Sequence, residues 1–487
     1  MSTPPDIVHL ASLRTKQIPR RCPAVIINGR PAMPPALGIP PIDRPAPIFN
    51  RRSRIADPEP PIPTFQGIHV RTLASLTLLL FAFPCGAAGD DWPQFRGPDG
   101  QGHSSARGLP LTWDETQNVA WKTPIAGRGW SSPVVRGDQI WLTTALDDGK
   151  SLRAVCFATQ TGKLMHDVEV FQPQQPGLVN AKNSHASPTP VIEKDRLWVH
   201  FGTLGTACLD TTNGAVLWRN DELRLDHQEG AGSSPVVCGD LLIVNCDGID
   251  VQYIAALDKR TGLVAWKTGR TGATNPKPDY RKAYSTPLAI DVAGRRQIIS
   301  VGAERAYAYD PLDGSELWWV DIPGFSNVPR PIFAHGVVYI ATGYMKPQLW
   351  AIRPDGHGDV GASHVAWRAA NQAPANPSPV LVDDLLFMVS DQGVATCLDA
   401  RSGKELGKTR LGGNYSASPV AADGRIYFFS EEGEGIVVTA DKDLKILARN
   451  RLEGRILASP AVVNRGLLVR TETHLYRIEG KSAAAVR

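Results

Sequence analysis

Polar and aromatic side chains recur in short segments that end just before a Ser-Pro pair or a close variant of it. The segments read AGRGW, NAKNSH, DHQEGAG, YRKAY, NVPR, APAN and GGNY. Guanidinium groups, amides, carboxylates and aromatic rings suit a polar ligand such as a sugar or an extended peptide. If one fold gathers the segments, they predict a ligand-binding opening formed by Arg128, Trp130, His185, Asp226, His227, Glu229, Arg281, Tyr284, Arg330, Asn376 and Tyr415. The alternative is that each residue only solvates or packs its own loop.

Arg330 stands out because it occupies the place that Ser or Thr holds before the Pro in seven other copies. Its guanidinium is expected either to bind an anion or to pair with a neighbouring acid. His227 lies beside Asp226 and Glu229, which could form a metal site or a general base. No second His stands at ligand spacing, so we predict a solvated polar loop and no metal. A pair of catalytic carboxylates cannot be assigned either.

Five cysteines follow residue 88, and none forms a CxxC motif, a Cys/His metal pattern or a CxxCH haem motif. Cys208 and Cys397 lie in ACLD and TCLD, and Cys156 aligns with them. Ala256 fills the same position in another copy, which predicts small buried strand residues. Cys238 and Cys246 flank a Gly-Asp turn but are not expected to face each other.

An internal repeat must position the loops. An Asp stands eight residues before a Trp in ACLDTTNGAVLW, AALDKRTGLVAW and YAYDPLDGSELW, at Asp210 and Trp218, Asp258 and Trp266, Asp310 and Trp318. The Ser-Pro signals recur about every 47 residues, at Pro133, Pro188, Pro235, Pro287, Pro331, Pro379, Pro419 and Pro460. Eight copies of this length predict a solenoid or a propeller.

Each copy contains four short apolar runs separated by Gly-Asp and Thr-Gly turns, which predicts four antiparallel strands. The fold class is therefore all-β, an eight-bladed β-propeller over 118–479. A Trp on the outer strand is expected to fill the gap to the next blade, at Trp121, Trp218, Trp266, Trp318 and Trp367, with His166 and Gly407 at aligned positions. The last copy has three strands, so we predict that 118–125 pairs with the strand around 470–478 and closes the ring.

The N-terminal part has a different composition. Residues 1–69 hold fifteen of the forty prolines and predict a disordered extension, or a start assigned too early. Residues 70–88 have the order of a secretory signal, which predicts a secreted or periplasmic protein. Its apolar run, eleven residues from Leu73 to Phe83, is shorter than the ~20 that span a bilayer. Residues 89–117 form a leader before the propeller, and 480–487 form a tail.

The net charge of +4 is confined to the N-terminal part, because residues 1–71 contribute +6 and the remainder about −2. A basic surface of the kind that binds nucleic acid is therefore not expected.

ALDKRTGLVAW resembles the PQQ-type repeat, the tryptophan-docking propeller of quinoprotein alcohol dehydrogenases and of the BamB-like outer-membrane assembly lipoproteins. The resemblance covers about 118–479. It implies, for the dehydrogenases, a vicinal Cys-Cys disulfide against the quinone, a carboxylate base and Glu/Asn/Asp calcium ligands. The chain has no Cys-Cys, and neither the base nor the calcium ligands can be aligned to its residues.

These differences favour a non-catalytic scaffold without a cofactor. We expect it to be a monomer that binds a protein, a sugar or another polar small molecule at the channel mouth. The alternative is a periplasmic alcohol or sugar dehydrogenase that uses pyrroloquinoline quinone and calcium.

Overall fold

The computed structural model describes residues 91–480. By its internal contacts the chain divides into two units, Met1–Leu80 and Phe81–Arg487, and every described residue belongs to the second. The extension predicted for 1–69, the signal predicted for 70–88 and all of the tail after Gly480 lie outside the described residues.

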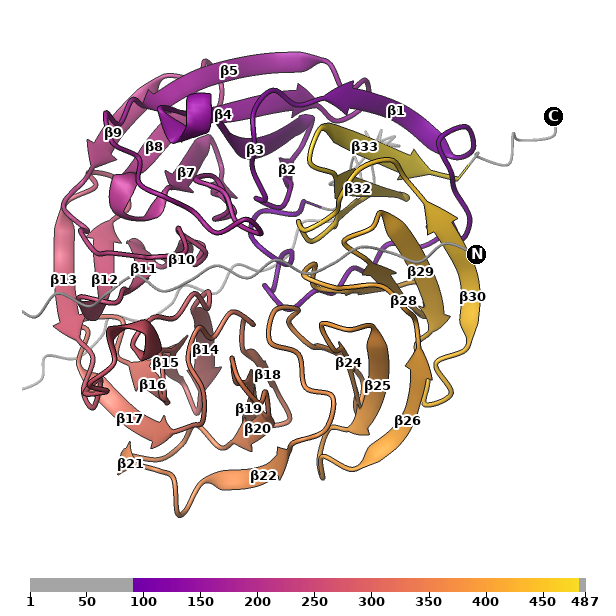
Figure 1. Cartoon of the computed structure of the whole chain (residues 1–487). Helices are drawn as coiled ribbons and strands as arrows, with labels where there is room; N and C mark the ends of the chain where they lie inside the picture. The colour runs from indigo at the N-terminus through magenta and orange to yellow at the C-terminus, as the bar shows by residue number, and fades with distance from the viewer. Residues whose placement is uncertain (1–90, 481–487) are drawn as a thin grey trace, which may run out of the picture. The chain divides into compact units, whose positions relative to one another are not determined.

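Eight antiparallel sheets form the blades of an eight-bladed β-propeller (Figure 1). Blade 1 contains β2 (Val134–Arg136), β3 (Gln139–Leu146), β4 (Ser151–Ala158) and β5 (Leu164–Phe171). Blade 2 contains β6 (Val191–Glu193), β7 (Arg196–His200), β8 (Thr206–Asp210) and β9 (Val216–Asn220). Blade 3 contains β10 (Val236–Cys238), β11 (Leu241–Asp247), β12 (Gln252–Asp258) and β13 (Val264–Gly269). Blade 4 contains β14 (Leu288–Val292), β15 (Arg295–Val301), β16 (Arg305–Tyr309) and β17 (Glu316–Asp321).

The second half of the ring repeats this order. Blade 5 contains β18 (Ile332–Ala334), β19 (Val337–Ala341), β20 (Leu349–Ile352) and β22 (Val365–Ala369). Blade 6 contains β23 (Val380–Val382), β24 (Leu385–Val389), β25 (Val394–Asp399) and β26 (Glu405–Arg410). Blade 7 contains β27 (Val420–Ala422), β28 (Arg425–Phe429), β29 (Glu434–Thr439) and β30 (Ile446–Arg451). Blade 8 contains β31 (Ala461–Val463), β32 (Gly466–Arg470), β33 (His474–Glu479) and, from the other end of the propeller, β1 (Val119–Pro124).

Short elements complete the architecture. β21 (Gly358–Asp359) pairs in parallel with β17 at the edge of blade 4. Three 3₁₀ turns are η1 (Asp147–Gly149), η2 (Gly202–Leu204) and η3 (Pro278–Tyr280). Within residues 91–480, no helix has the length and apolar character needed to span a bilayer.

The turn between the third and fourth strands of a blade explains the repeated Asp and Gly. In blade 3, a carboxylate oxygen of Asp258 accepts the backbone N–H groups of Arg260 and Thr261 at 3.0 and 2.9 Å. Gly262 has a φ of +77°, and a Cβ there would lie 2.4 Å from the ring of Trp218 in blade 2. The turn therefore needs Gly both for its backbone conformation and for the close approach of the neighbouring Trp.

Four of the outer-strand tryptophans bind the next blade through their indole N–H. Trp218 donates to the Lys259 carbonyl at 3.2 Å, and Trp266 donates to the Pro311 carbonyl at 2.9 Å. Trp121 and Trp367 make the same contact with Thr159 and Ala400.

The other outer-strand positions use different contacts. Trp318 is fully buried and donates to Gln297 of its own sheet. His166 stacks on Trp141 with ring centroids 5.6 Å apart. A Cβ at Gly407 would collide with the Lys442 carbonyl oxygen of blade 7. This close approach explains why Gly replaces Trp at this position.

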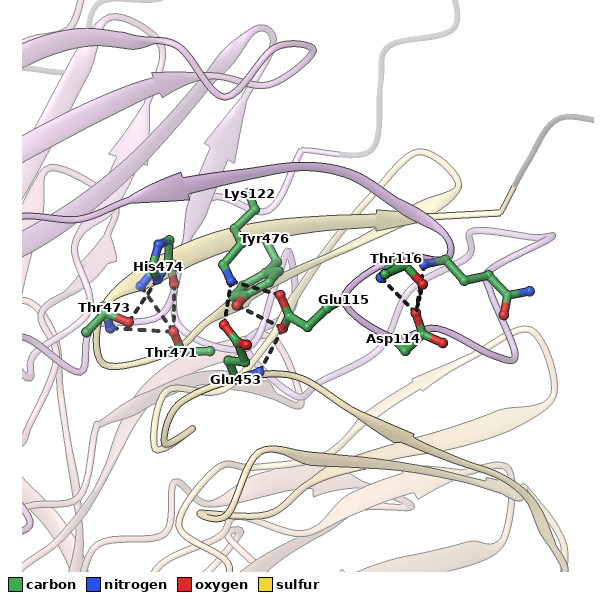
Figure 2. A network of polar contacts seen from close by, with 10 residues as sticks. Asp114, Glu115, Thr116, Lys122, Glu453, Thr471, Thr473, His474 and Tyr476 are labelled. Atoms are coloured by element: carbon green, nitrogen blue, oxygen red, sulfur yellow. Dashed lines mark hydrogen bonds and ion pairs between the residues drawn. The ribbon is translucent and has the colours of Figure 1, made fainter.

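Blade 8 joins the two ends of the propeller because β1 pairs with β33, with Trp121 opposite Arg477 and Pro124 opposite His474. Lys122 on β1 lies between Glu115 and Glu453, at 2.8 and 2.9 Å (Figure 2). The Tyr476 hydroxyl donates to Glu115 at 3.1 Å. Hydrogen bonding to Glu115 raises the pKa of Lys122. This network ties β1 to both β33 and the segment after β30.

The leader runs along the innermost strands, and Figure 1 shows this indigo segment in the middle of the ring. Trp92 pairs with Val135 of β2, and the Pro93 carbonyl accepts the Ile192 N–H of β6. Further along, Gln101 accepts the Phe333 N–H of β18 at 2.6 Å, and His103 bridges to Ala421 of β27. The leader thus contacts blades on opposite sides of the channel.

Candidate functional site

A cavity of about 570 Å³ occupies the channel. Phe95 of the leader lines it, as do residues that precede the innermost strands of seven blades and residues of the loops before them. Because Phe95 belongs to the segment that crosses the ring, the leader forms the floor, and the inter-blade loops form the walls.

A ring of hydroxyl side chains surrounds the channel. Seven Ser and Thr residues line the cavity, and each directly precedes a Pro. We call them the hydroxyl ring: Ser132, Thr189, Ser234, Thr286, Ser378, Ser418 and Ser459. The backbone N–H of Ser132 donates to the Thr189 hydroxyl at 2.9 Å, and the N–H of Thr189 donates to the Ser234 hydroxyl at 2.9 Å. The same contact recurs from Ser234 to Thr286, Arg330 to Ser378, Ser378 to Ser418 and Ser418 to Ser459.

The hydroxyl ring corrects one sequence assignment. The pair in blade 2 is Thr189–Pro190, two residues after the predicted Pro188, because Thr189 both donates and accepts within the ring. In the sequence these residues serve only to mark the repeat, although the hydroxyl before each Pro is the signal that could have identified the cavity wall.

Arg330 occupies the eighth place in the ring. No acidic side chain among residues 91–480 forms an ion pair with it, and the alternative, that it binds an anion, stays a prediction. Its side chain is buried and donates to the carbonyls of Phe95 at 2.6 Å and Pro287 at 3.2 Å. A third contact reaches the Gln94 side chain at 3.3 Å. Gly100 packs on the guanidinium, where a Cβ would lie 2.3 Å from Nη1. Arg330 therefore holds the leader in the channel, and burial lowers its pKa to about 10.

Charged side chains around the cavity are arranged as pairs. Glu229 accepts a hydrogen bond from Lys282 at 3.0 Å and another from the Asn180 amide. The contact with Lys282 lowers the pKa of Glu229. Lys182 binds Glu431 of blade 7 at 2.8 Å, although Lys182 comes from the loop between blades 1 and 2. The pairs leave amides and hydroxyls as the main polar groups of the wall.

Three aromatic residues, which we call the aromatic rim, lie together at the loops of blades 3 to 5: Tyr280, Phe325 and Tyr344. Tyr280 stacks on Phe325 with centroids 4.2 Å apart, and Phe325 meets Tyr344 edge to face at 5.8 Å. Phe325 and Tyr344 also line the cavity. Tyr344 is 59% exposed, so part of the rim is accessible to solvent beside the cavity.

Four predicted site residues line this cavity: Trp130, Glu229, Tyr284 and Asn376. The Tyr284 hydroxyl donates to the His227 carbonyl at 2.8 Å, and burial raises its pKa. Asn376 donates to Asp391. Trp130 is 7% exposed, and its backbone N–H donates to the Ala186 carbonyl at 3.1 Å.

His185, Asp226 and His227 line a second cavity of about 490 Å³, beside apolar residues such as Leu204 and Leu225. The His227 Nε2 accepts the Thr203 N–H at 3.1 Å, which requires a neutral ring. Burial lowers the His227 pKa to about 4. The described residues contain no group of three or more His, Cys, Asp or Glu side chains placed to hold a metal ion.

The remaining predicted residues, Arg128, Arg281, Arg330 and Tyr415, line neither cavity. Arg128 donates to the Ala181 carbonyl, and Arg281 donates to the Asn275 carbonyl at 2.6 Å. Tyr415 is 1% exposed and packs in an apolar cluster with residues of blades 6 and 7. Arg330 binds the leader, as described above.

Other lining residues stand beside the predicted ones in the sequence but were not predicted. Asn180, Lys182 and Asn183 belong to the loop from which His185 was chosen, and Lys282 follows Arg281 directly. The five described cysteines are buried and unpaired. This agrees with the burial predicted for Cys156, Cys208 and Cys397 and with the expectation that Cys238 and Cys246 do not pair. None of them lines the cavity.

The ring of blades and its central cavity define an eight-bladed propeller with a candidate ligand site in the channel. A family model described as outer membrane protein assembly factor BamB matches residues 104–246, 250–357 and 358–457, more than half of the chain. The chain therefore belongs to this family of propeller proteins.

Individual relatives are distant. The outer membrane protein assembly factor BamB of Yersinia pestis is 25% identical over 267 residues, which cover 44% of this chain and 66% of the relative. The protein of the same name from Escherichia coli K12 is 32% identical over 93 residues, 19% of this chain and 23% of the relative. The chain thus matches less than two thirds of the length of either. The crystal structure of BamB from Moraxella catarrhalis has a TM-score of 0.52 at 13% identity, with 74% of this chain and 99% of that chain covered, which shows the shared fold.

Proposed function

We propose that this protein is a non-catalytic binding scaffold, secreted or periplasmic, that holds a segment of a partner protein at the mouth of the propeller channel. The observation that carries the proposal is the aromatic rim beside the cavity. Exposed Tyr344 and stacked Phe325 provide rigid apolar surface next to amides and hydroxyls. Buried aromatic anchors surrounded by polar groups are typical of residues that dominate protein–protein binding energy.

Family membership supports the same proposal. The curated relatives carry the name of outer membrane protein assembly factors. An envelope location agrees with the secretory signal predicted for 70–88. A mature chain that begins near Gly89 would be recognised by its intact mass after export from the native host, and an exported chain that retains 1–69 would contradict it.

The residues of the cavity do not match the quinone and calcium that the dehydrogenase resemblance implies. Calcium takes six to eight oxygen ligands, usually with several carboxylates. Glu229 is the one carboxylate among the lining residues, and it is bound by Lys282 and Asn180. The cysteines that could form a disulfide against a quinone are buried in strands. We therefore propose no cofactor and no redox step.

Site-specific photo-crosslinking tests the proposal. A benzoyl-phenylalanine is placed at Tyr344 of the rim, and at Leu312, a matched control that is 87% exposed on a turn of blade 4. We expect position 344 to form a covalent adduct with a defined protein in the native host and position 312 to form none with that protein. Adducts of the same composition at both positions would contradict a specific site at the mouth. If the mouth of the channel bound a sugar in place of a protein, position 344 would form no protein adduct.

A further inference from the structure

The O–H groups of the hydroxyl ring are hydrogen-bond donors, and most of them have no acceptor among the described residues. Six of its hydroxyls each accept a backbone N–H from the preceding blade, at 2.9 to 3.0 Å. A hydroxyl that has accepted one hydrogen bond still carries one O–H donor. None of the six donates to a residue within 91–480, and all six line the same cavity.

Trp130 adds a further donor to this wall. It lines the cavity, its side chain is 7% exposed, and its indole N–H is buried without a partner among the described residues. A buried N–H without an acceptor costs free energy, so such groups in proteins usually meet a ligand or a bound molecule.

Three buried arginines carry positive charge at the ring. Arg330 occupies its eighth place, Arg96 donates to the carbonyl of Pro379, and Arg470 donates to the hydroxyl of Ser131 at 2.7 Å. Pro379 follows Ser378 of the ring, and Ser131 precedes Ser132. The three side chains are 1 to 2% exposed.

The charge of these arginines is not balanced locally. Their donors meet carbonyl and hydroxyl oxygens, and none of the three forms an ion pair with a described residue. Asp99 is the acid that acts on Arg96 and Arg330, but it is itself paired with His103 at 2.8 Å. Burial lowers the pKa of Arg96 and of Arg470 to about 9, so both remain charged at neutral pH. Buried cations without carboxylate partners create a positive potential in the channel.

We propose that the hydroxyl ring binds the anionic oxygen group, a carboxylate or a phosphate, of a ligand that enters the channel. An oxyanion accepts several hydrogen bonds at once, which suits O–H and N–H donors that converge on one space. A cation would be repelled by the arginines, and a neutral sugar would need acceptors as well as donors. The cavity of about 570 Å³ has room for a molecule that carries the anionic group. This site lies in the channel wall and does not depend on the partner proposed for the rim.

Calorimetric titration of the purified chain tests the site with four probes: inorganic phosphate, acetate, glucose 6-phosphate and glucose. We expect phosphate or acetate to bind, glucose 6-phosphate to bind at least tenfold more tightly than glucose, and the affinity to fall with added salt. The preference between phosphate and acetate then identifies which oxyanion the ring selects. Equal affinity for glucose and glucose 6-phosphate would overturn the proposal, as would the absence of binding by all anions at millimolar concentration.

Variants locate the anion. Ser378→Ala with Ser418→Ala removes two ring donors and should weaken anion binding about tenfold or more, because hydrogen bonds to charged groups are strong. Ser187→Ala is the matched control, since Ser187 also lines the cavity but gives its O–H to Asn183. If the double variant does not fold, Trp130→Phe removes the indole N–H while keeping an aromatic ring, and should weaken binding at least threefold. Anion binding that is unchanged in the folded ring variants, or equally weakened in Ser187→Ala, would overturn the proposal.

Discussion

Acid should destabilise this propeller through two histidines that are held neutral. His200 is 2% exposed at the end of β7, where its Nδ1 contacts the Thr206 hydroxyl at 2.8 Å. Burial lowers the pKa of His200 to about 3, and the nearby His227 contributes to this shift. Burial lowers the His227 pKa to about 4. Neither ring takes up a proton in the folded protein until well below neutral pH.

The sign of the effect follows from the lowered pKa values. An unfolded histidine binds a proton below a pH of about 6.5, whereas the folded rings stay neutral. The stability that the neutral rings provide is therefore complete above about 6.5 and is lost as the pH falls toward 4 for His227 and 3 for His200. Proton linkage gives a loss of about 2 kcal/mol per histidine between pH 7 and pH 5, or about 4 kcal/mol for the pair.

Urea unfolding at pH 7 and pH 5 measures this loss. His200→Gln should reduce the pH-dependent part of the unfolding free energy by about 2 kcal/mol, whatever its effect on stability at pH 7. His357→Gln, at an exposed position between β20 and β21, controls for the substitution itself. If wild type, His200→Gln and His357→Gln lose the same free energy between the two pH values, buried neutral histidines do not explain the acid sensitivity.

Three further predictions follow from the blades and the cavity. Trp266→Ala should destabilise the protein by ~3 to 5 kcal/mol, because it empties a contact between blades and removes the bond to Pro311; thermal unfolding beside Leu312→Ala, which should change little, is the check. Deletion of 118–125 should lower the melting temperature and the solubility far more than removal of 481–487, because it unpairs β33; unchanged melting would contradict the role of β1. Reconstitution with pyrroloquinoline quinone and calcium should give no sustained reduction of an artificial electron acceptor from alcohols or aldoses, and reduction that stops on calcium chelation would favour the dehydrogenase alternative.

The sequence was sufficient to predict the fold because each blade repeats the same local requirements. The Asp of the turn, the Gly with positive φ and the outer Trp recur at fixed spacing, so one copy explains the others. The pairing of 118–125 with β33 could be predicted from a count of strands alone.

The site was predictable only in part, because loop residues carry no periodic signal. Trp130 and Tyr284 line the cavity, whereas Lys182 and Lys282, which also line it, were passed over. Arg330 was noticed for its unusual place, yet two of its partners, Gln94 and Phe95, come from the leader, more than 200 residues earlier in the chain. A contact of that kind depends on the path of the leader through the ring, which no repeat unit specifies.

The proposed function assigns the binding of a partner to the aromatic rim at the mouth of the channel. The most direct measurement is the affinity of the purified chain for the protein that crosslinks at position 344, compared between wild type, Phe325→Ala with Tyr344→Ala, and Leu312→Ala. The rim variant should bind at least about 30-fold more weakly, as for an aromatic hot spot of ~2 kcal/mol or more, while Leu312→Ala should bind like wild type. Equal affinity of the rim variant and wild type would contradict this assignment.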